Sequence, residues 1–234
     1  FQYKRRETST VHIGAIDMGS DFPVRVQSMT TTNTNDTEAC VRQAEEIIKA
    51  GGELVRLTTQ GKREAENLKN INAQLRSEGY TTPLVADVHF NPNVADVAAL
   101  YAEKVRINPG NYVDPARKFI KQEYTDEEYA AELKKIEDRL IPFLNICKAN
   151  HTAIRIGVNH GSLSDRIRNR YGDTPEGIVE SCMEFLRVCK RENFTDVVIS
   201  IKSSNTVVMV RSVRLLVHQM DKEGMNYPLH LGVT

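Results

Sequence analysis

The chain has 234 residues, of which 40% are hydrophobic and 26% are charged, enough to bury one large core. Lys and Arg together number 31, the same as Asp and Glu, so no net field recruits nucleic acid or a membrane surface. No apolar run approaches the roughly 18 residues that a membrane-spanning helix needs. We therefore expect neither nucleic acid nor membrane as a partner.

Seven short apolar runs have the length and composition of β-strands, and each carries polar or charged side chains toward its carboxyl end. Alternate residues of a strand face opposite sides of the sheet. In the second run, Arg56 shares one face with Thr58, while Val55 and Leu57 take the other. One face of every run is thus apolar and the other polar. The predicted strands are 24–29, 53–58, 83–88, 104–108, 153–159, 196–202 and 228–234.

Between the strands, apolar residues recur at helical spacing. Alternating strands and helices are typical of a parallel sheet with right-handed crossovers. The sequence therefore predicts an α/β fold, a TIM-type (β/α) barrel. Such barrels usually have eight strands, so we expect the eighth to lie beyond the end of this chain. The predicted helices are 36–50, 63–78, 93–102, 174–191 and 206–223.

Two connections are unusual. Residues 1–22 precede the first barrel strand, and we interpret them as a short hairpin that plugs the amino-terminal mouth of the barrel. The barrel itself is expected to take residues 23–234. Residues 112–151 form a crossover long enough to hold an extra helix, and Pro142 is expected to kink or interrupt the main helix there.

Cations gather at the predicted mouth of the barrel, where the carboxyl ends of the strands meet and where such barrels hold their sites. Asp87 is the one carboxylate at a matching depth. Unless these cations reach solvent or pair with glutamates on helices, the mouth favours a ligand with two or more negative charges. Arginine forks fit phosphate oxygens two at a time. The cations are Arg56, Arg106, Arg155 and Lys202.

Uncharged polar residues share the inward face with these cations. Asn108, Asn159 and Ser200 lie on it, and loops 108–111, 159–163 and 202–205 carry the Gly, Ser and Asn that expose backbone amides to anions. Two histidines, His89 and His230, also face inward. Histidine is the usual acid–base side chain, although spacing alone assigns neither of them a proton transfer.

The four cysteines form no CxxC pair, and each falls within an apolar helical pattern. This favours buried thiols in a reducing compartment over a metal site, so no metal ligand is predicted in this chain. The cysteines are Cys40, Cys147, Cys182 and Cys189.

Seven motifs, within a match that runs from about Thr10 to Thr234, together resemble the barrel domain of the 4-hydroxy-3-methylbut-2-enyl diphosphate synthase family. The resemblance implies a substrate-binding barrel of an iron–sulfur oxidoreductase. Members convert 2-C-methyl-D-erythritol 2,4-cyclodiphosphate to 4-hydroxy-3-methylbut-2-enyl diphosphate by two-electron reductive ring opening and dehydration, in the methylerythritol phosphate route to isoprenoids. The motifs, in chain order, are VQSMT, LVRLT, VADVHF, VRINPGN, IRIGVNHGSL, ISIKSS and HLGVT.

The resemblance also implies roles for the inward residues. The four cations would clamp the diphosphate of the substrate, and the remaining inward side chains would orient the substrate or the clamp or line the mouth. The substrate-binding residues expected on this basis are Arg56, Asp87, His89, Arg106, Asn108, Arg155, Asn159, Ser200, Lys202 and His230.

The family's 4Fe–4S cluster is held by a separate carboxyl-terminal domain, so the resemblance implies that this chain binds no cofactor and is inactive by itself. Ferredoxin or flavodoxin would donate the electrons to the full-length enzyme, which is expected to be cytoplasmic, or plastid in a plant, and could be a homodimer. The long crossover at 112–151 resembles the larger, three-domain form of the family.

Two other functions fit the same pattern. A pterin-binding transferase of the dihydropteroate synthase type also uses Asn, Asp, Lys and Arg at strand ends, but with fewer arginines. A non-catalytic barrel that binds anionic metabolites would need no electron donor. The number of inward cations favours the diphosphate synthase.

Overall fold

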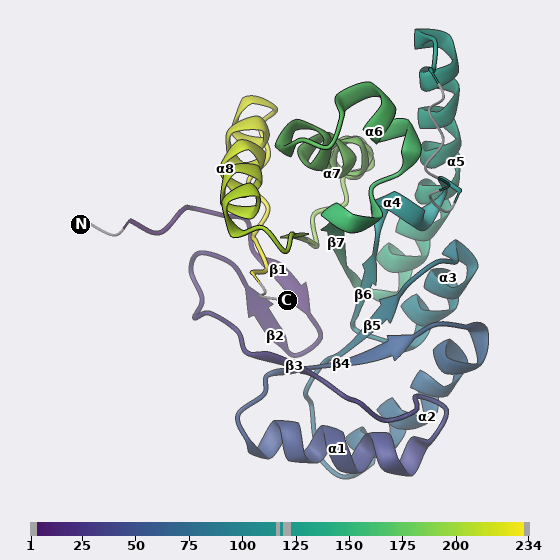
Figure 1. The fold of residues 1–234 in the computed structure, drawn as a ribbon. Coiled ribbons are helices and arrows are strands. Elements are labelled where there is room, and N and C mark those ends of the chain that lie inside the picture. Colours follow the sequence, from purple (N-terminus) through teal and green to yellow (C-terminus); the bar gives the residue numbers. More distant parts are fainter. Residues whose placement is uncertain (1–3, 116–117, 119–122, 232–234) are drawn as a thin grey trace.

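The computed structural model describes residues 4–115, 118 and 123–231, and its centre is a six-stranded parallel sheet (Figure 1). The strands follow one another in chain order across the sheet, as right-handed βαβ repeats produce. The strands are β3 (Gln27–Met29), β4 (Leu54–Thr59), β5 (Leu84–Val88), β6 (Lys104–Ile107), β7 (Ala153–Asn159) and β8 (Val197–Lys202).

The seventh predicted barrel strand is reduced, within the described residues, to one parallel bridge between Leu229 and Ile199 of β8. The amide of Ile199 donates to Pro228 O at 3.1 Å, and the amide of His230 donates to Ile199 O at 2.8 Å. The segment thus follows β8 in the expected direction and order. Residues 232–234 of this run lie outside the described part of the chain.

Helices cover the outer face of the sheet, and the α/β barrel-type fold is confirmed. The five predicted helices agree with the observed ones to within two residues. Their caps explain this agreement: Asp36, for example, accepts the amide of Ala39 at 3.0 Å. The helices are α1 (Thr37–Lys49), α2 (Lys62–Ser77), α3 (Pro92–Tyr101), α4 (Pro109–Tyr112), α5 (Asp126–Asn150), the 3-10 helix η1 (His160–Ser162), α6 (Asp165–Tyr171), α7 (Pro175–Arg191) and α8 (Thr206–Lys222).

The crossover after β6 differs from the prediction. Helix α5 runs without interruption from Asp126 to Asn150 and contains Pro142, so an interruption there is wrong. Leu140 and Phe143, on either side of the proline, are both fully buried. Their burial offsets the roughly 3 kcal/mol that an interior proline costs. The one further helix in the described part of this connection is the short α4 at its start, and sequence patterns also missed α6.

An antiparallel hairpin, β1 (Val11–Ile13) and β2 (Ile16–Met18), lies against the inner side of the sheet near its amino-terminal end (Figure 1). Val11 and Ile13 share a small buried cluster with side chains from the strands. The strand residues of that cluster are Leu54, Val85, Ala153 and Val198. Below the polar interior, the sheet therefore has an apolar floor; the division of the chain at residue 22 stays a prediction.

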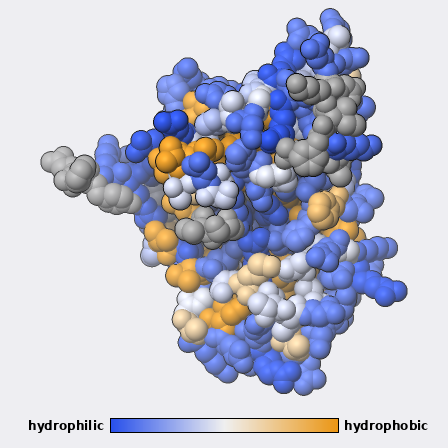
Figure 2. Space-filling view, viewed as in Figure 1, coloured by the Kyte–Doolittle hydropathy of each residue, from blue (hydrophilic) through white to orange (hydrophobic). Residues whose placement is uncertain are grey.

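The surface in the orientation of Figure 2 is mostly hydrophilic, with separate hydrophobic patches rather than one continuous band. Exposed apolar side chains include Val24, Val26, Phe90 and Val207. Among the described residues, no helix is both long enough and apolar enough to cross a membrane.

The loops after β6 and β7 touch at Gly110. A Cβ atom at Gly110 would lie 1.9 Å from the carbonyl oxygen of Ser162, which is far inside van der Waals contact. A Cβ atom at Gly161, in the neighbouring loop, would meet only the side-chain oxygen of Asn159, at 3.6 Å. The first glycine is therefore required by close backbone approach, and the second is not.

We expect Gly110→Ala to destabilise the protein by about 1–3 kcal/mol, because the added methyl group forces the two loops apart. Gly161→Ala is the matched control and should change stability by less than about 0.5 kcal/mol. Urea denaturation followed by circular dichroism measures both. Equal stability of the two variants would contradict the close contact.

Candidate anion-binding site

The inner face of the sheet is polar above its apolar floor, as the alternation in the sequence predicts. The opposite face packs against the helices in the main core, where Val55, Leu57, Ile154 and Ile156 are fully buried. The inward positions on successive strands carry charged groups at neighbouring heights, because Asp87 pairs in register with Arg106. A parallel sheet with this register concentrates the charges in one layer.

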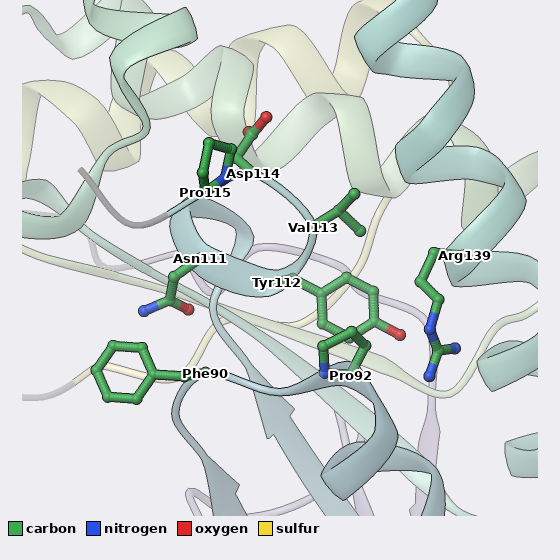
Figure 3. A pocket seen from close by; sticks show the side chains of 8 residues that line it. All are labelled: Phe90, Pro92, Asn111, Tyr112, Val113, Asp114, Pro115 and Arg139. Atoms are coloured by element: carbon green, nitrogen blue, oxygen red, sulfur yellow. The ribbon is translucent and has the colours of Figure 1, made fainter. Parts of the chain in front are cut away.

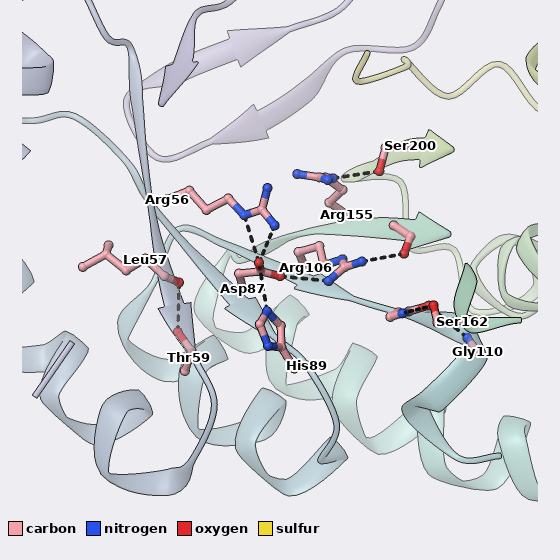
Figure 4. Close-up of polar contacts among 12 residues, drawn as sticks. Arg56, Leu57, Thr59, Asp87, His89, Arg106, Gly110, Arg155, Ser162 and Ser200 are labelled. Atoms are coloured by element: carbon pink, nitrogen blue, oxygen red, sulfur yellow. Dashed lines mark hydrogen bonds and ion pairs between the residues drawn. The ribbon is translucent and has the colours of Figure 1, made fainter. Parts of the chain in front are cut away.

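Asp87 lies at the centre of this layer and binds two arginines (Figure 4). Arg56 Nε donates to Asp87 Oδ2 at 3.1 Å, and its Nη2 donates to the same oxygen. Arg106 Nη1 donates to Asp87 Oδ1 at 3.0 Å. His89 Nε2 lies 3.2 Å from Asp87 Oδ2. One carboxylate therefore orients two guanidinium groups and an imidazole.

Asp87 stays ionised. Burial by itself would raise its pKa, but the hydrogen bond with His89 and the charges of Arg106 and Arg56 outweigh burial and hold the pKa well below its usual value. Arg106 is held further by Gly157 of β7, whose carbonyl accepts from Nη2 at 3.0 Å. Gly157 also makes room, since a Cβ atom there would lie 2.5 Å from Arg106 Nε.

Arg155 is the least satisfied of the inward arginines. Its side chain is fully buried, and its Nε donates to Ser200 Oγ at 2.9 Å. Within the described residues, Nη1 and Nη2 have no hydrogen-bond partner. Burial and the charges of Arg56 and Arg106 lower its pKa to about 9. A buried guanidinium with two unmet donors is unfavourable unless an anion binds it.

Lys104 is a fifth inward cation, and the sequence analysis missed it. The side chain is fully buried, and within the described part of the chain its ammonium donates only to Gln27 Oε1, at 3.1 Å. Burial, followed by the charges of Arg155 and Arg56, lowers its pKa to about 7. The signal was available, because Lys104 has the same parity on its strand as Arg106.

Lys202 and His230 complete the positive field near the mouth. Lys202, at the end of β8, is paired in register with Asn159, and burial with the charges of Arg56 and Arg155 lowers its pKa. Burial and the surrounding cations, Arg155 first among them, lower the pKa of His230 to about 3. The imidazole of His230 is therefore neutral near pH 7.

Asn108 and Asn159 fix the loops after β6 and β7 through side-chain hydrogen bonds. Asn108 accepts the amide of Gly110 at 3.1 Å and donates to Ser162 Oγ at 2.8 Å. Asn159 accepts the amide of Gly161 at 3.1 Å. These two glycine amides are bound by asparagine side chains, so the expectation that they point at an anion does not hold. The loops after β6 and β7 are instead linked to each other.

The third predicted loop behaves similarly. Asn205 accepts the amides of Val207 and Val208 at 3.0 and 3.1 Å and so caps α8 itself. Ser203 Oγ lies 3.2 Å from Nδ1 of His160, which joins this loop to the one after β7. All three loops therefore frame the mouth by binding one another.

Of the ten predicted site residues, four are joined by direct contacts centred on Asp87: Arg56, Asp87, His89 and Arg106. Arg155 and Ser200 form a separate hydrogen-bonded pair, and the charges of Arg56 and Arg106 act on its guanidinium. The charges of Arg155 and Arg56 also contribute to the lowered pKa values of Lys202 and His230. Asn108 and Asn159 lie at the strand ends, in the loops.

The cysteines are buried on three outer helices: Cys40 on α1, Cys147 on α5, and Cys182 with Cys189 on α7. Burial raises the pKa of the thiols of Cys147, Cys182 and Cys189. Across the described ranges, no group of three or more His, Cys, Asp and Glu side chains has the geometry of a metal site. These thiols therefore do not fit an iron–sulfur cluster.

A cavity of about 490 Å³ lies beside the charged interior, between the loop after β5, α4 and α5 (Figure 3). Its lining is largely apolar and includes Phe90 and Tyr112. The two charged groups in it have other partners, since Arg139 binds Asp96 and Asp114 binds Arg166. The cavity lacks free charge for an anion, so the interior of the barrel is the better candidate.

Fold and site together define an α/β-barrel protein with a buried, cation-rich interior. Residues 8–234 match the GcpE TIM-barrel domain, and the chain belongs to this family. The resemblance noted in the sequence is thereby confirmed.

Relatives match the whole chain. They include proteins named 4-hydroxy-3-methylbut-2-en-1-yl diphosphate synthase (flavodoxin) from Phocaeicola vulgatus, at 76% identity, and from Leptospira interrogans, at 47% identity. The match covers 100% of this chain, but 38% and 35% of those relatives. The chain thus spans little more than a third of their length.

Solved structures resemble the fold at low sequence identity. A 7,8-dihydropteroate synthase from Vibrio fischeri aligns with 94% of this chain and 76% of its own at a TM-score of 0.56, with 12% identity. A truncated 3-deoxy-D-arabino-heptulosonate 7-phosphate synthase from Thermotoga maritima aligns with 95% of this chain and 68% of its own at a TM-score of 0.54, with 10% identity. These likenesses concern the fold alone.

We expect Lys104→Met to stabilise the ligand-free protein at neutral and lower pH, and to do so less as the pH rises above 7. The pKa of Lys104 is about 7 in the folded state, against 10.5 as its ordinary value. Between these values the unfolded chain binds more protons, so the stability of the native protein rises with pH. The advantage of the variant should therefore shrink by roughly 3 kcal/mol between pH 7 and pH 9.5.

Urea denaturation at a series of pH values measures this difference. Lys134→Met is the control, because Lys134 is an exposed residue of α5 that makes an ion pair with Asp138. An advantage of Lys104→Met that does not vary with pH would contradict the buried, perturbed ammonium.

Proposed function

We propose that this barrel is the substrate-binding part of an iron–sulfur oxidoreductase, 4-hydroxy-3-methylbut-2-enyl diphosphate synthase. In the proposed reaction, 2-C-methyl-D-erythritol 2,4-cyclodiphosphate takes up two electrons and two protons. The ring C–O bond to the diphosphate breaks, one water leaves, and 4-hydroxy-3-methylbut-2-enyl diphosphate forms. The names of the relatives, which match the whole chain, support this choice of reaction.

The observation that carries the proposal is the buried, unpartnered guanidinium of Arg155. A diphosphate offers pairs of acceptor oxygens that two nitrogens of one planar guanidinium group can bind at the same time. Arg56 and Arg106, fixed on Asp87, would bind further oxygens from the neighbouring strands. Lys202 at the strand end would add a mobile charge. The net positive interior thus suits a ligand with two negative charges.

The other inward residues would position the clamp and the carbon skeleton. Asp87 orients two arginines, and Ser200 orients the third. His89 and the neutral His230 would line the path of the substrate at the mouth. Asn108 and Asn159 would hold the loops around it. No proton-transfer role is assigned to either histidine.

Electrons would come from a 4Fe–4S cluster held by a further domain of the longer protein, since the cysteines of this chain do not fit one. When bound, that cluster would supply the two electrons that the ring opening consumes. The task of the barrel is then to hold the diphosphate and to keep the carbon skeleton at the open mouth. This chain by itself would not complete the reaction.

The partner that delivers the electrons is proposed to be flavodoxin, because the relatives carry that word in their names. Ferredoxin is the other candidate. We place the protein in the cytoplasm, in keeping with its bacterial relatives, and a homodimer is a further proposal.

A pterin-binding transferase is the second reading of the fold. Its support is the likeness to dihydropteroate synthase, which at 12% identity concerns the fold and not the ligand. The number of inward cations and the identity of the full-coverage relatives favour the diphosphate synthase instead.

We expect Arg155→Met in the intact protein to lower kcat/KM by about 30- to 1,000-fold, because a charged donor to the diphosphate is lost; this equals about 2–4 kcal/mol. The measurement is reductive turnover of the cyclodiphosphate with a chemical electron donor. Arg42→Met, an exposed change on α1, is the matched control and should retain activity.

Turnover in Arg155→Met that equals the native value would refute the clamp. Binding of a pterin pyrophosphate in place of the cyclodiphosphate, measured by calorimetry on the native protein, would favour the transferase.

A further inference from the structure

Lys104 sits deeper in the barrel than the arginines of the proposed clamp. It is paired in register with Val85 and Ala153, which belong to the apolar floor, and it precedes Arg106 by two positions on the same face. Two positions along a strand amount to roughly 7 Å. The ammonium of Lys104 is thus close enough to interact electrostatically with an anion bound by the clamp, and it lies too deep for direct access from solvent.

The hydrogen bond between Lys104 and Gln27 crosses the interior. Gln27 belongs to β3 and Lys104 to β6, and the sheet order puts two strands between them. The contact exists because the sheet curls. An amide oxygen can accept from either the ammonium or the neutral amine, so Gln27 places the nitrogen without fixing its charge.

No carboxylate in the described interior is free to neutralise Lys104. Asp87, the anionic group of this layer, is already bound by two arginines. The hairpin below contributes the apolar Val11 and Ile13. The charges that act on Lys104 are those of Arg155 (β7) and Arg56 (β4), and Lys104 acts in turn on His230. The other charged groups of the interior are Asp87 (β5), Arg106 (β6) and Lys202 (β8).

We propose that Lys104 takes up a proton when the diphosphate binds, so that ligand binding by this barrel is coupled to proton uptake at its floor. This rests on the proposed function, since the ligand must be an anion held by the clamp. Without ligand, the surrounding cations and the dry floor disfavour the ammonium. A diphosphate above it reverses the sign of the local field, and the ammonium becomes the favoured form.

The ionisation of Lys104 agrees with this geometry. Burial and two arginines bring its pKa to about 7, so both of its forms are populated near neutral pH in the empty barrel. A group with a pKa near the working pH exchanges protons most readily when its surroundings change. His230 is the competing proton acceptor, because the same cations act on it and a bound anion would offset them. Burial and these cations lower its pKa to about 3, so it is the weaker acceptor near pH 7.

The experiment is calorimetric titration of the intact protein with the cyclodiphosphate at pH 7.5, in buffers of different ionisation enthalpy. This ligand is a suitable probe because each phosphorus of a cyclic diphosphate carries one strongly acidic oxygen. The ligand itself therefore neither takes up nor releases a proton near pH 7. The slope of the observed enthalpy against buffer enthalpy gives the number of protons taken up. We expect about 0.3–0.8 proton per site for the native protein.

Three variants separate the acceptors. Lys104→Met should bind the ligand with a proton uptake close to zero. We expect the affinity of the native protein to decline about three- to tenfold between pH 7 and 9, and the affinity of the variant to stay constant over this range. His230→Gln and the surface control Lys134→Met should retain the uptake of the native protein. Methionine keeps the unbranched, apolar part of the lysine side chain without its charge, so the variant is expected to fold.

Uptake that persists in Lys104→Met, or that disappears in His230→Gln instead, overturns the inference and leaves the proposed function intact. Binding without any uptake in the native protein does the same. If the native protein fails to bind the cyclodiphosphate, the proposed function is wrong, and this inference falls with it.

Discussion

The bond between Asp87 and the guanidinium groups of Arg56 and Arg106 is the interaction on which the rest of the interior depends. Without it, five cations would face one another in a space with an apolar floor. One carboxylate cannot neutralise them all, so the interior keeps a net positive charge, which is the basis of the proposed anion binding. Burial first, and this charge imbalance after it, lower the pKa values of Arg155, Lys104, Lys202 and His230, which disfavours their charged forms.

Much of this could be predicted from the sequence, because the two-residue period of a strand is a strict geometric rule. Arg56, Arg106, Arg155 and Lys202 were assigned to the interior by parity alone, and the opposite parity forms the core. Lys104 obeys the same parity, but it begins its strand, whereas the pattern that predicts the site consists of polar residues near the carboxyl ends. Its burial depends on the hairpin floor and on the curl of the sheet, which join segments far apart in the chain.

Other features could not be read from local pattern. The backbone contact between Gly110 and Ser162 joins two loops about fifty residues apart, and only the packed structure reveals why the glycine is needed. Pro142 predicts a break by local chemistry, but tertiary packing of the same helix holds it intact. The loop amides expected to bind anions were instead bound by Asn108 and Asn159, because an asparagine at a helix start caps its own chain.

The missing side chain at Gly157 bears on how such a barrel could change its ligand. Arg106 passes through the space that a Cβ atom on the neighbouring strand would fill, 2.5 Å from its Nε. The position of the Arg106 guanidinium thus depends partly on residue 157 of the neighbouring strand. A lineage or a designer could redirect the guanidinium by adding one methyl group at residue 157, with the arginine itself unchanged. The arrangement of cations in the interior therefore has a steric control that a comparison of the charged residues alone would not reveal.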